Sequence, residues 1–211
     1  MFRYSMAGLL VLCSSVWAKG EGGLYADVAP AGSTFIRVIN SAKGNAPKVS
    51  VGKIEFSELG FCKATDYVFM PKGEIPVIVD GVKTGAEFKD DTFYTVVLGG
   101  SEVKVIEDPY FENKRKALVS LYNLRNKSGA ISLKAKAGTI DVVSGVSTLE
   151  YKDREINAVT MQFDVFESDT LITRLEEQSF TRGDVFSVFA CGEAESAASN
   201  WAKLTVTAPS E

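Results

Sequence analysis

The stretch STFIRVIN, Ser33–Asn40, has a close relative later in the chain, ALVSLYN at Ala117–Asn123. Each is a short apolar run with one hydrophilic interruption and a closing Asn, a composition typical of a β-strand. Aligning Phe35 with Leu118 places the two runs 83 residues apart. Because similar strand sequences occur twice, the chain is interpreted as containing two copies of one domain.

Two further pairs of segments follow in the same order. APKVSVGK is echoed by SGAISLKA at an offset of 82 residues, and DTFYTVVLGG by GDVFSVFACG at an offset of 92. A longer loop in the second copy accounts for the change in offset. We interpret the chain as two tandem domains of roughly a hundred residues each, an ordinary domain size. The alternative is that two unrelated β domains share strand-like strings by chance.

The pattern along the chain predicts an all-β protein. In AVTMQFDVF, residues 158–166, apolar and polar residues alternate, which indicates one half-buried antiparallel strand. Asp80-Gly81, Gly99-Gly100 and Ala137-Gly138 each lie between apolar runs, as tight hairpin turns do. Many short strands joined by such turns predict antiparallel β-sandwiches.

The domain boundaries follow from charge and hydropathy. Residues 1–18 contain an apolar run, Met6–Cys13, that is too short to span a bilayer, and they predict a secretory signal peptide. The first sandwich is expected at 19–108 and the second at 117–211. Between them, residues 109–116 form a basic linker within the charged stretch EDPYFENKRK. We expect an exported, periplasmic protein with no transmembrane segment after cleavage.

The chain contains no histidine, which excludes several enzyme classes. Serine and cysteine hydrolases and the usual acyltransferases use an imidazole to move a proton, and many zinc sites need His ligands. A glycosidase needs only two carboxylates. The adjacent pairs Asp90-Asp91, Glu107-Asp108 and Glu176-Glu177 are better interpreted as solvated turn charges. We therefore predict no catalytic residue, no metal site and no cofactor.

Net charge argues against a nucleic-acid partner. The whole chain has a net charge of −4, and removing residues 1–18, whose only charged residue is Arg3, makes it −5. No global positive field attracts a polyanion. Any contact with an acidic partner must be local.

Two cysteines remain after the predicted cleavage, Cys62 and Cys191. An exported chain meets oxidising conditions in which such a pair can close. We predict a disulfide that ties the first sandwich to the end of the second, with two free buried thiols as the alternative.

Four segments resemble successive blocks of the alginate biosynthesis protein AlgF family: LYADVAPAGSTFIRVIN, DTFYTVVL, FENKRKALVSLYNL and REINAVTMQFDVFE. The resemblance runs from about Leu24 to Trp201. It implies a periplasmic protein required for O-acetylation of alginate, acting with a membrane-bound acyltransferase and a histidine-bearing periplasmic acetyltransferase. Segments such as 57–65 match weakly, and the two cysteines are not part of the resemblance.

Alginate is a polymer of uronic acids, so a binding surface for it would combine Arg or Lys with aromatic rings. The candidate polymer- or partner-binding residues are Phe111, Lys114, Arg115, Lys116, Tyr122, Arg37 and Arg154. The basic run at the domain junction could equally be a solubilising linker, and either arginine could be a structural ion-pair partner.

Three functions remain open on this sequence. The first is a non-catalytic adaptor that links the acetylation enzymes to one another or to alginate. The second is an enzyme that acts on the polysaccharide with carboxylates. The third is a structural subunit of the envelope, which would donate a strand to a neighbour. The absence of histidine favours the adaptor.

Overall fold

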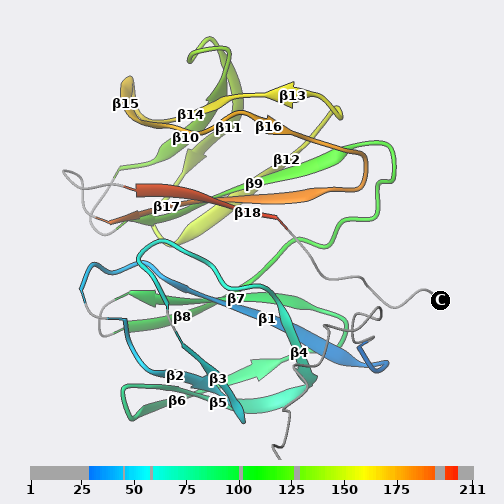
Figure 1. Ribbon diagram of the computed structural model, residues 1–211, viewed down its shortest axis with the longest axis vertical. Helices are drawn as coiled ribbons and strands as arrows, with labels where there is room; N and C mark the ends of the chain where they lie inside the picture. Colours follow the sequence, from blue (N-terminus) through cyan, green and yellow to red (C-terminus); the bar gives the residue numbers. More distant parts are fainter. Residues whose placement is uncertain are drawn as a thin grey trace, which may run out of the picture.

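The computed structural model describes residues 29–44, 46–57, 59–99, 102–125, 129–192 and 198–203, the last of these by backbone alone. The predicted signal peptide, residues 1–18, lies outside the described residues. The described chain forms strands and turns in two β-sandwiches that stack one on the other (Figure 1). The predicted all-β class with two sandwiches is confirmed.

The first sandwich is built from two four-stranded sheets. In spatial order, the sheet nearer the second sandwich contains β4 (Val68–Pro71), β1 (Ser33–Asn40), β7 (Phe93–Gly99) and β8 (Glu102–Glu107). The outer sheet contains β3 (Ile54–Phe56), β2 (Val49–Val51), β5 (Gly73–Val79) and β6 (Val82–Phe88).

The second sandwich repeats this arrangement. Its inner sheet contains β12 (Glu150–Ile156), β9 (Ala117–Arg125), β17 (Val185–Gly192) and β18 (Ala198–Lys203). Its outer sheet contains β11 (Ile140–Val146), β10 (Ile131–Ala135), β14 (Phe163–Glu167) and β15 (Thr170–Arg174). A small extra sheet pairs β13 (Thr160–Met161) with β16 (Gln178–Ser179). The order of strands is otherwise the same in both sandwiches, as a duplication predicts.

Each sandwich contains one parallel pair among its antiparallel ones. β1 runs parallel to β7, with Phe35 opposite Phe93, and β9 runs parallel to β17, with Leu118 opposite Val185. The sequence pattern did not indicate this, because hairpin signals report only neighbours along the chain, whereas these partners are separated by most of a domain.

The two repeated strands lie at the centre of the molecule. Every residue of β1 and of β9 is buried. One face of β1, with Ile36 and Val38, packs into the core of its own sandwich, and the other, with Ile39, packs against the second sandwich. A strand that is covered on both faces has a nearly continuous apolar sequence. This explains why apolar and polar residues do not alternate strictly in STFIRVIN and ALVSLYN.

The segment AVTMQFDVF departs from the prediction of one continuous strand. It is divided at Gln162, whose side-chain amide donates to the Leu175 carbonyl at 3.0 Å. The first half, β13, pairs in the small sheet, while Phe163 and Val165 in β14 are buried in the core. Val159 is thereby left 42% exposed at the surface.

Candidate functional site

The inner sheets of the two sandwiches pack face to face and enclose an apolar cluster. Ile39, Val97 and Ile106 come from the first sandwich, and Tyr122 and Phe189 from the second. Because this surface is removed from water on both sides, the sandwiches form one packed body.

Arg37 lies in this interface with only 2% of its side chain exposed. Its Nε donates to Thr95 Oγ1 at 2.8 Å, and its Nη2 donates to Ser187 Oγ at 3.0 Å and to the Tyr122 hydroxyl at 3.3 Å. Its guanidinium carbon lies 4.6 Å from the ring centre of Tyr67. One side chain of β1 therefore contacts both sandwiches.

Asp108, just beyond β8, is the counter-charge. Its Oδ2 is 3.6 Å from Arg37 Nη2, and its side chain is 3% exposed. Its carboxylate accepts hydrogen bonds from Tyr67 at 2.6 Å, from Tyr122 at 2.6 Å and from Thr95 at 2.7 and 2.8 Å. The interpretation of Asp108 as a solvated turn charge is wrong, because the second sandwich covers the end of β8.

The pKa values of the two tyrosines respond to this enclosure. Burial, together with the charge of Asp108, raises the pKa of Tyr122 well above its usual value. Burial also raises the pKa of Tyr67, with Arg37 opposing the shift and Asp108 adding to it. For Arg37, burial alone would lower the pKa, but Asp108 and the tyrosines outweigh it and the pKa is raised. The phenols stay protonated and donate to a carboxylate that faces a permanent cation.

The remaining space around this ion pair is about 10 Å³, lined by Arg37, Tyr67, Asp108, Tyr122 and Ser187 among others. That volume is about the size of one water molecule. No sugar or acetyl donor fits there. Arg37 and Tyr122 join the two sandwiches here, which for Arg37 fits the alternative of a structural ion-pair partner.

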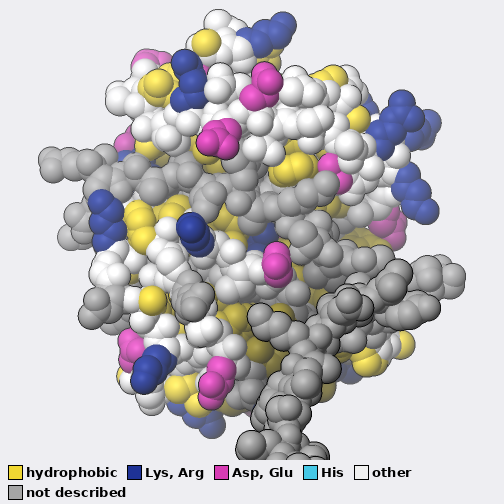
Figure 2. Space-filling view, viewed as in Figure 1, with side chains coloured by type: hydrophobic (Ala, Val, Ile, Leu, Met, Phe, Trp, Pro, Cys, Tyr) yellow, Lys and Arg dark blue, Asp and Glu magenta, His cyan; other side chains and the backbone are white. Residues whose placement is uncertain are grey.

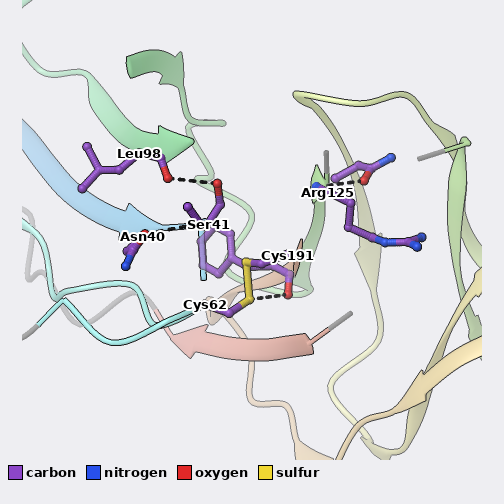
Figure 3. Close-up of a disulfide and its surroundings, with 9 residues drawn as sticks. Asn40, Ser41, Cys62, Leu98, Arg125 and Cys191 are labelled. Atoms are coloured by element: carbon purple, nitrogen blue, oxygen red, sulfur yellow. Dashed lines mark hydrogen bonds between the residues drawn. A yellow bond between two sulfur atoms is a disulfide. The ribbon is translucent and has the colours of Figure 1, made fainter. Parts of the chain in front are cut away.

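A disulfide reinforces the same interface. Cys62, in the loop between β3 and β4, is bonded to Cys191 of β17, with a Cα–Cα distance of 5.7 Å and a sequence separation of 129 residues (Figure 3). Both cysteines are buried in the apolar cluster between the sandwiches. The bond thus links the two halves of the chain beside the end of β1.

An open groove of about 750 Å³ lies at the edge of the second sandwich where β11 and β12 meet. We call it the C-terminal groove. Its apolar side chains include Ile140, Val159 and Met161, and its basic ones are Lys116, Lys136 and Arg154. Ile140 is 44% exposed and Val159 is 42% exposed, so the floor of the groove presents aliphatic surface to solvent.

The basic residues of the C-terminal groove lack carboxylate partners. Arg154 Nη1 donates to the carbonyls of Asp141 and Val142 at 2.9 and 3.2 Å. Lys116 Nζ donates to Asn157 Oδ1 at 2.5 Å. Among the described residues, none of the three cations forms an ion pair. The lining of the groove contains one more cation than carboxylates, in a chain that is acidic overall.

Two carboxylates also line the groove, but they are solvated. Asp141 is exposed and lies 3.6 Å from Lys134 Nζ. Glu155 is exposed and accepts a hydrogen bond from the Asn113 amide at 2.8 Å. Both carboxylates thus have polar partners at the surface.

The predicted site residues thus lie in three places. Lys116 and Arg154 line the C-terminal groove, whereas Arg37 and Tyr122 are sealed between the sandwiches. Lys114 and Arg115 are exposed on the connection before β9, and Phe111 is partly buried there. Of the basic run, only Lys116 lines the C-terminal groove.

Sequence reasoning missed Lys136, Ile140 and Val159 as groove residues, and Asp108 and Tyr67 as partners of Arg37. The alternation of AVTMQFDVF assigned Val159 to the core. Its exposure depends on the break at Gln162, which no local pattern signals.

In the part of the chain that the structure describes, no cluster of three or more Cys, Asp or Glu could hold a metal ion. No helix in that part could cross a bilayer. On the face shown in Figure 2, acidic and basic side chains are interspersed over both sandwiches.

The fold and the sites define a class: an all-β protein of two matching sandwiches joined by a sealed ion pair, with an open basic groove at one edge. A family model described as "Alginate O-acetyl transferase AlgF" matches residues 7–187. The alginate biosynthesis protein AlgF of Pseudomonas fluorescens is 32% identical over 202 residues, covering 95% of this chain and 91% of that protein. That of Pseudomonas aeruginosa PAO1 is 31% identical over 189 residues, covering 89% and 86%. The chain belongs to the AlgF family, which is involved in alginate O-acetylation, and the resemblance noted in the sequence is confirmed.

A solved structure is also similar to one part of the chain. The C-terminal domain of AlgF from P. aeruginosa is 32% identical, with a TM-score of 0.39, and covers 43% of this chain and 99% of that one.

Proposed function

We propose that this protein is a non-catalytic periplasmic adaptor in alginate O-acetylation, which links the acetylation enzymes to one another or to the polymer. The observation that carries the proposal is the enclosure of Arg37, Asp108 and the two tyrosines. These charged and phenolic groups contact one another in the interior, and the space beside them holds no more than a water molecule. They stabilise the protein and are closed to a substrate.

The chemistry of acetyl transfer supports an accessory role. Transfer to a sugar hydroxyl needs a base that takes the proton and donors that stabilise the oxyanion, and His most often supplies the base. This chain has no histidine. The exposed carboxylates of the C-terminal groove, Asp141 and Glu155, face cations or amides rather than an activated nucleophile. We propose that a membrane-bound acyltransferase and a periplasmic acetyltransferase supply the chemistry.

The predicted signal peptide and the disulfide support a periplasmic location, because disulfides persist in oxidising compartments. The envelope-subunit alternative lacks comparable support, since β1 and β9, the repeated strands, are both central in their sheets.

The proposal is tested in cells and with the purified chain. Deleting the gene should leave alginate production intact but lower its acetyl content, and the wild-type gene should restore it. The purified protein, given an acetyl ester donor and mannuronate oligomers, should transfer no acetyl group above background. Transfer by the purified chain that is lost in Asp141→Asn or Glu155→Gln would instead make it an enzyme that uses carboxylates.

A further inference from the structure

We propose that the C-terminal groove binds an extended, acidic peptide segment with apolar side chains, contributed by a protein partner. The inference rests on the proposed adaptor function and assigns it a surface. Its first support is charge. Lys116, Lys136 and Arg154 surround the groove without ion-pair partners among the described residues, so an acidic ligand gains their attraction without breaking an existing pair.

The second support is the exposed aliphatic floor. Ile140 and Val159 are each more than two-fifths exposed, and they line the same groove as Met161. Isolated exposed apolar side chains are common, but several gathered in a concave site gain free energy when a ligand covers them. Valine, leucine or isoleucine side chains of a peptide would provide that cover.

The same floor argues against alginate as the ligand. A uronate polymer has carboxylates and hydroxyls but no aliphatic side chains, and no residue that lines the groove is aromatic. Such a polymer would satisfy the three cations and leave the floor uncovered. A peptide that alternates acidic and aliphatic residues satisfies both, because successive side chains of an extended chain point to opposite sides.

Hydrogen bonding at this edge limits how the peptide binds. The β11 carbonyls of Asp141 and Val142 accept from Arg154, and those of Ser144 and Gly145 accept from Lys152 at 3.2 and 2.7 Å. These bonds connect β12 to β11 across the open edge of the sandwich, and they already use carbonyl groups of β11. A peptide therefore binds through side-chain contacts in the groove and does not extend the outer sheet by strand addition.

The probe is a fluorescein-labelled peptide of four Glu-Val repeats, titrated with the full mature chain and followed by anisotropy. It should bind, and binding should weaken as salt is added. A Lys-Val peptide of the same length should not bind, and mannuronate oligomers should not compete.

Two groove variants test the two halves of the argument. Lys136→Glu should weaken peptide binding about fivefold, as expected for the loss of an exposed charge contact. Val159→Ser should weaken it roughly threefold by removing aliphatic surface. Lys83→Glu makes the same charge change on β6 of the other sandwich and should have no effect. Lys152→Ala removes cross-edge hydrogen bonds outside the groove and should also bind normally.

The inference is overturned if the Glu-Val peptide does not bind, or if Lys136→Glu and Val159→Ser bind it as tightly as the wild type does. Competition by mannuronate oligomers that is sensitive to Lys136→Glu would make the groove a polymer site and would equally overturn it. None of these results changes the outcome of the gene-deletion test. The proposed adaptor function can therefore hold even if the groove is not the surface that binds the partner.

Discussion

Arg37 and Ser120 occupy equivalent positions in the two sandwiches. Arg37 of β1 lies opposite Thr95 in the parallel pair of the first sandwich, and Ser120 of β9 lies opposite Ser187 in that of the second. Arg37 makes hydrogen bonds to both sandwiches, whereas the fully buried Ser120 Oγ has no hydrogen-bond partner among the described residues. The two repeats thus place a cation and an unsatisfied hydroxyl at the same point of one fold.

Ser120→Ala and Ser187→Ala should have opposite effects on stability. Replacing Ser120 removes a buried hydroxyl without a partner and should leave the free energy of unfolding unchanged or raise it by up to about 1 kcal/mol. Replacing Ser187 removes an acceptor for the Arg37 guanidinium and should lower it by about 2 kcal/mol. Urea unfolding of the two variants measures both. Equal destabilisation would mean that Ser120 has a hydrogen-bond partner in solution.

Asp108→Asn should be strongly destabilising. The change leaves the Arg37 charge buried without its counter-charge, and breaking a buried pair from one side costs about 3–5 kcal/mol. The matched control is Lys72→Ala, which breaks the exposed pair with Asp90 and should change stability little. A loss for Asp108→Asn no larger than for the control would mean that the interface is hydrated.

How much of this fold the sequence predicts is clear from β1 and β9. Their composition identified them as strands, and their similarity predicted two sandwiches, because strand character and repetition are local properties. Their parallel partners β7 and β17 could not be predicted, since pairing across most of a domain leaves no local signal.

High pH should destabilise the protein through Tyr67 and Tyr122. Burial first, and then the charge of Asp108, hold the pKa of Tyr122 above the ordinary value of 10.0, and Tyr67 is shifted in the same direction. The unfolded chain therefore releases these protons while the folded protein keeps them. Their contribution to stability is complete below pH 10 and is lost as the pH rises toward the folded-state values.

The free energy of unfolding should fall by about 1.4 kcal/mol per pH unit for each phenol above pH 10. Urea unfolding between pH 8 and 11.5 measures this slope. In the Tyr67→Phe/Tyr122→Phe double variant, the decrease of the free energy of unfolding with pH should be smaller by the contribution of about two protons. An unchanged slope would show that the two phenols titrate normally.

The Cys62–Cys191 bond should resist alkylation and couple the sandwiches. Protein purified from the periplasm without reductant should take up no iodoacetamide at either position, as measured by intact mass. The closed loop is long, with 129 residues of separation, so the chain-entropy model allows a stabilisation of up to about 5 kcal/mol. Cys62→Ser/Cys191→Ser should unfold at lower urea. Two freely alkylated thiols in the native protein would contradict the bond.

Gly138 and Gly81 form a matched pair of turn glycines, both with φ of +86°. Alanine at either position adopts a left-handed backbone, which costs about 1–2 kcal/mol. A Cβ at Gly81 meets open space, whereas a Cβ at Gly138 lies 2.8 Å from the Phe166 ring. Gly138→Ala should therefore lower the melting temperature more than Gly81→Ala does. Equal losses would show that the ring moves aside freely.

The candidate site was less predictable than the fold. Lys116 was identified from the sequence because it belongs to the basic run at the domain junction, and Arg154 because it lies in a segment that resembles a family block. Lys136 was not, because it comes close to Arg154 only through the meeting of β11 and β12 at the edge of the sandwich. Arg37 looked like a binding residue because the second sandwich, which buries it, lies far along the chain.

The way the two sandwiches face each other limits the valency of the molecule. Had the repeats pointed the same sheet outward, one chain would carry two equivalent patches, and a repetitive polymer could engage both and gain avidity. Instead, the equivalent sheets β4-β1-β7-β8 and β12-β9-β17-β18 cover each other. The duplication has doubled the hydrophobic interior and left each outer surface to diverge, so we expect one copy of a given partner for each chain.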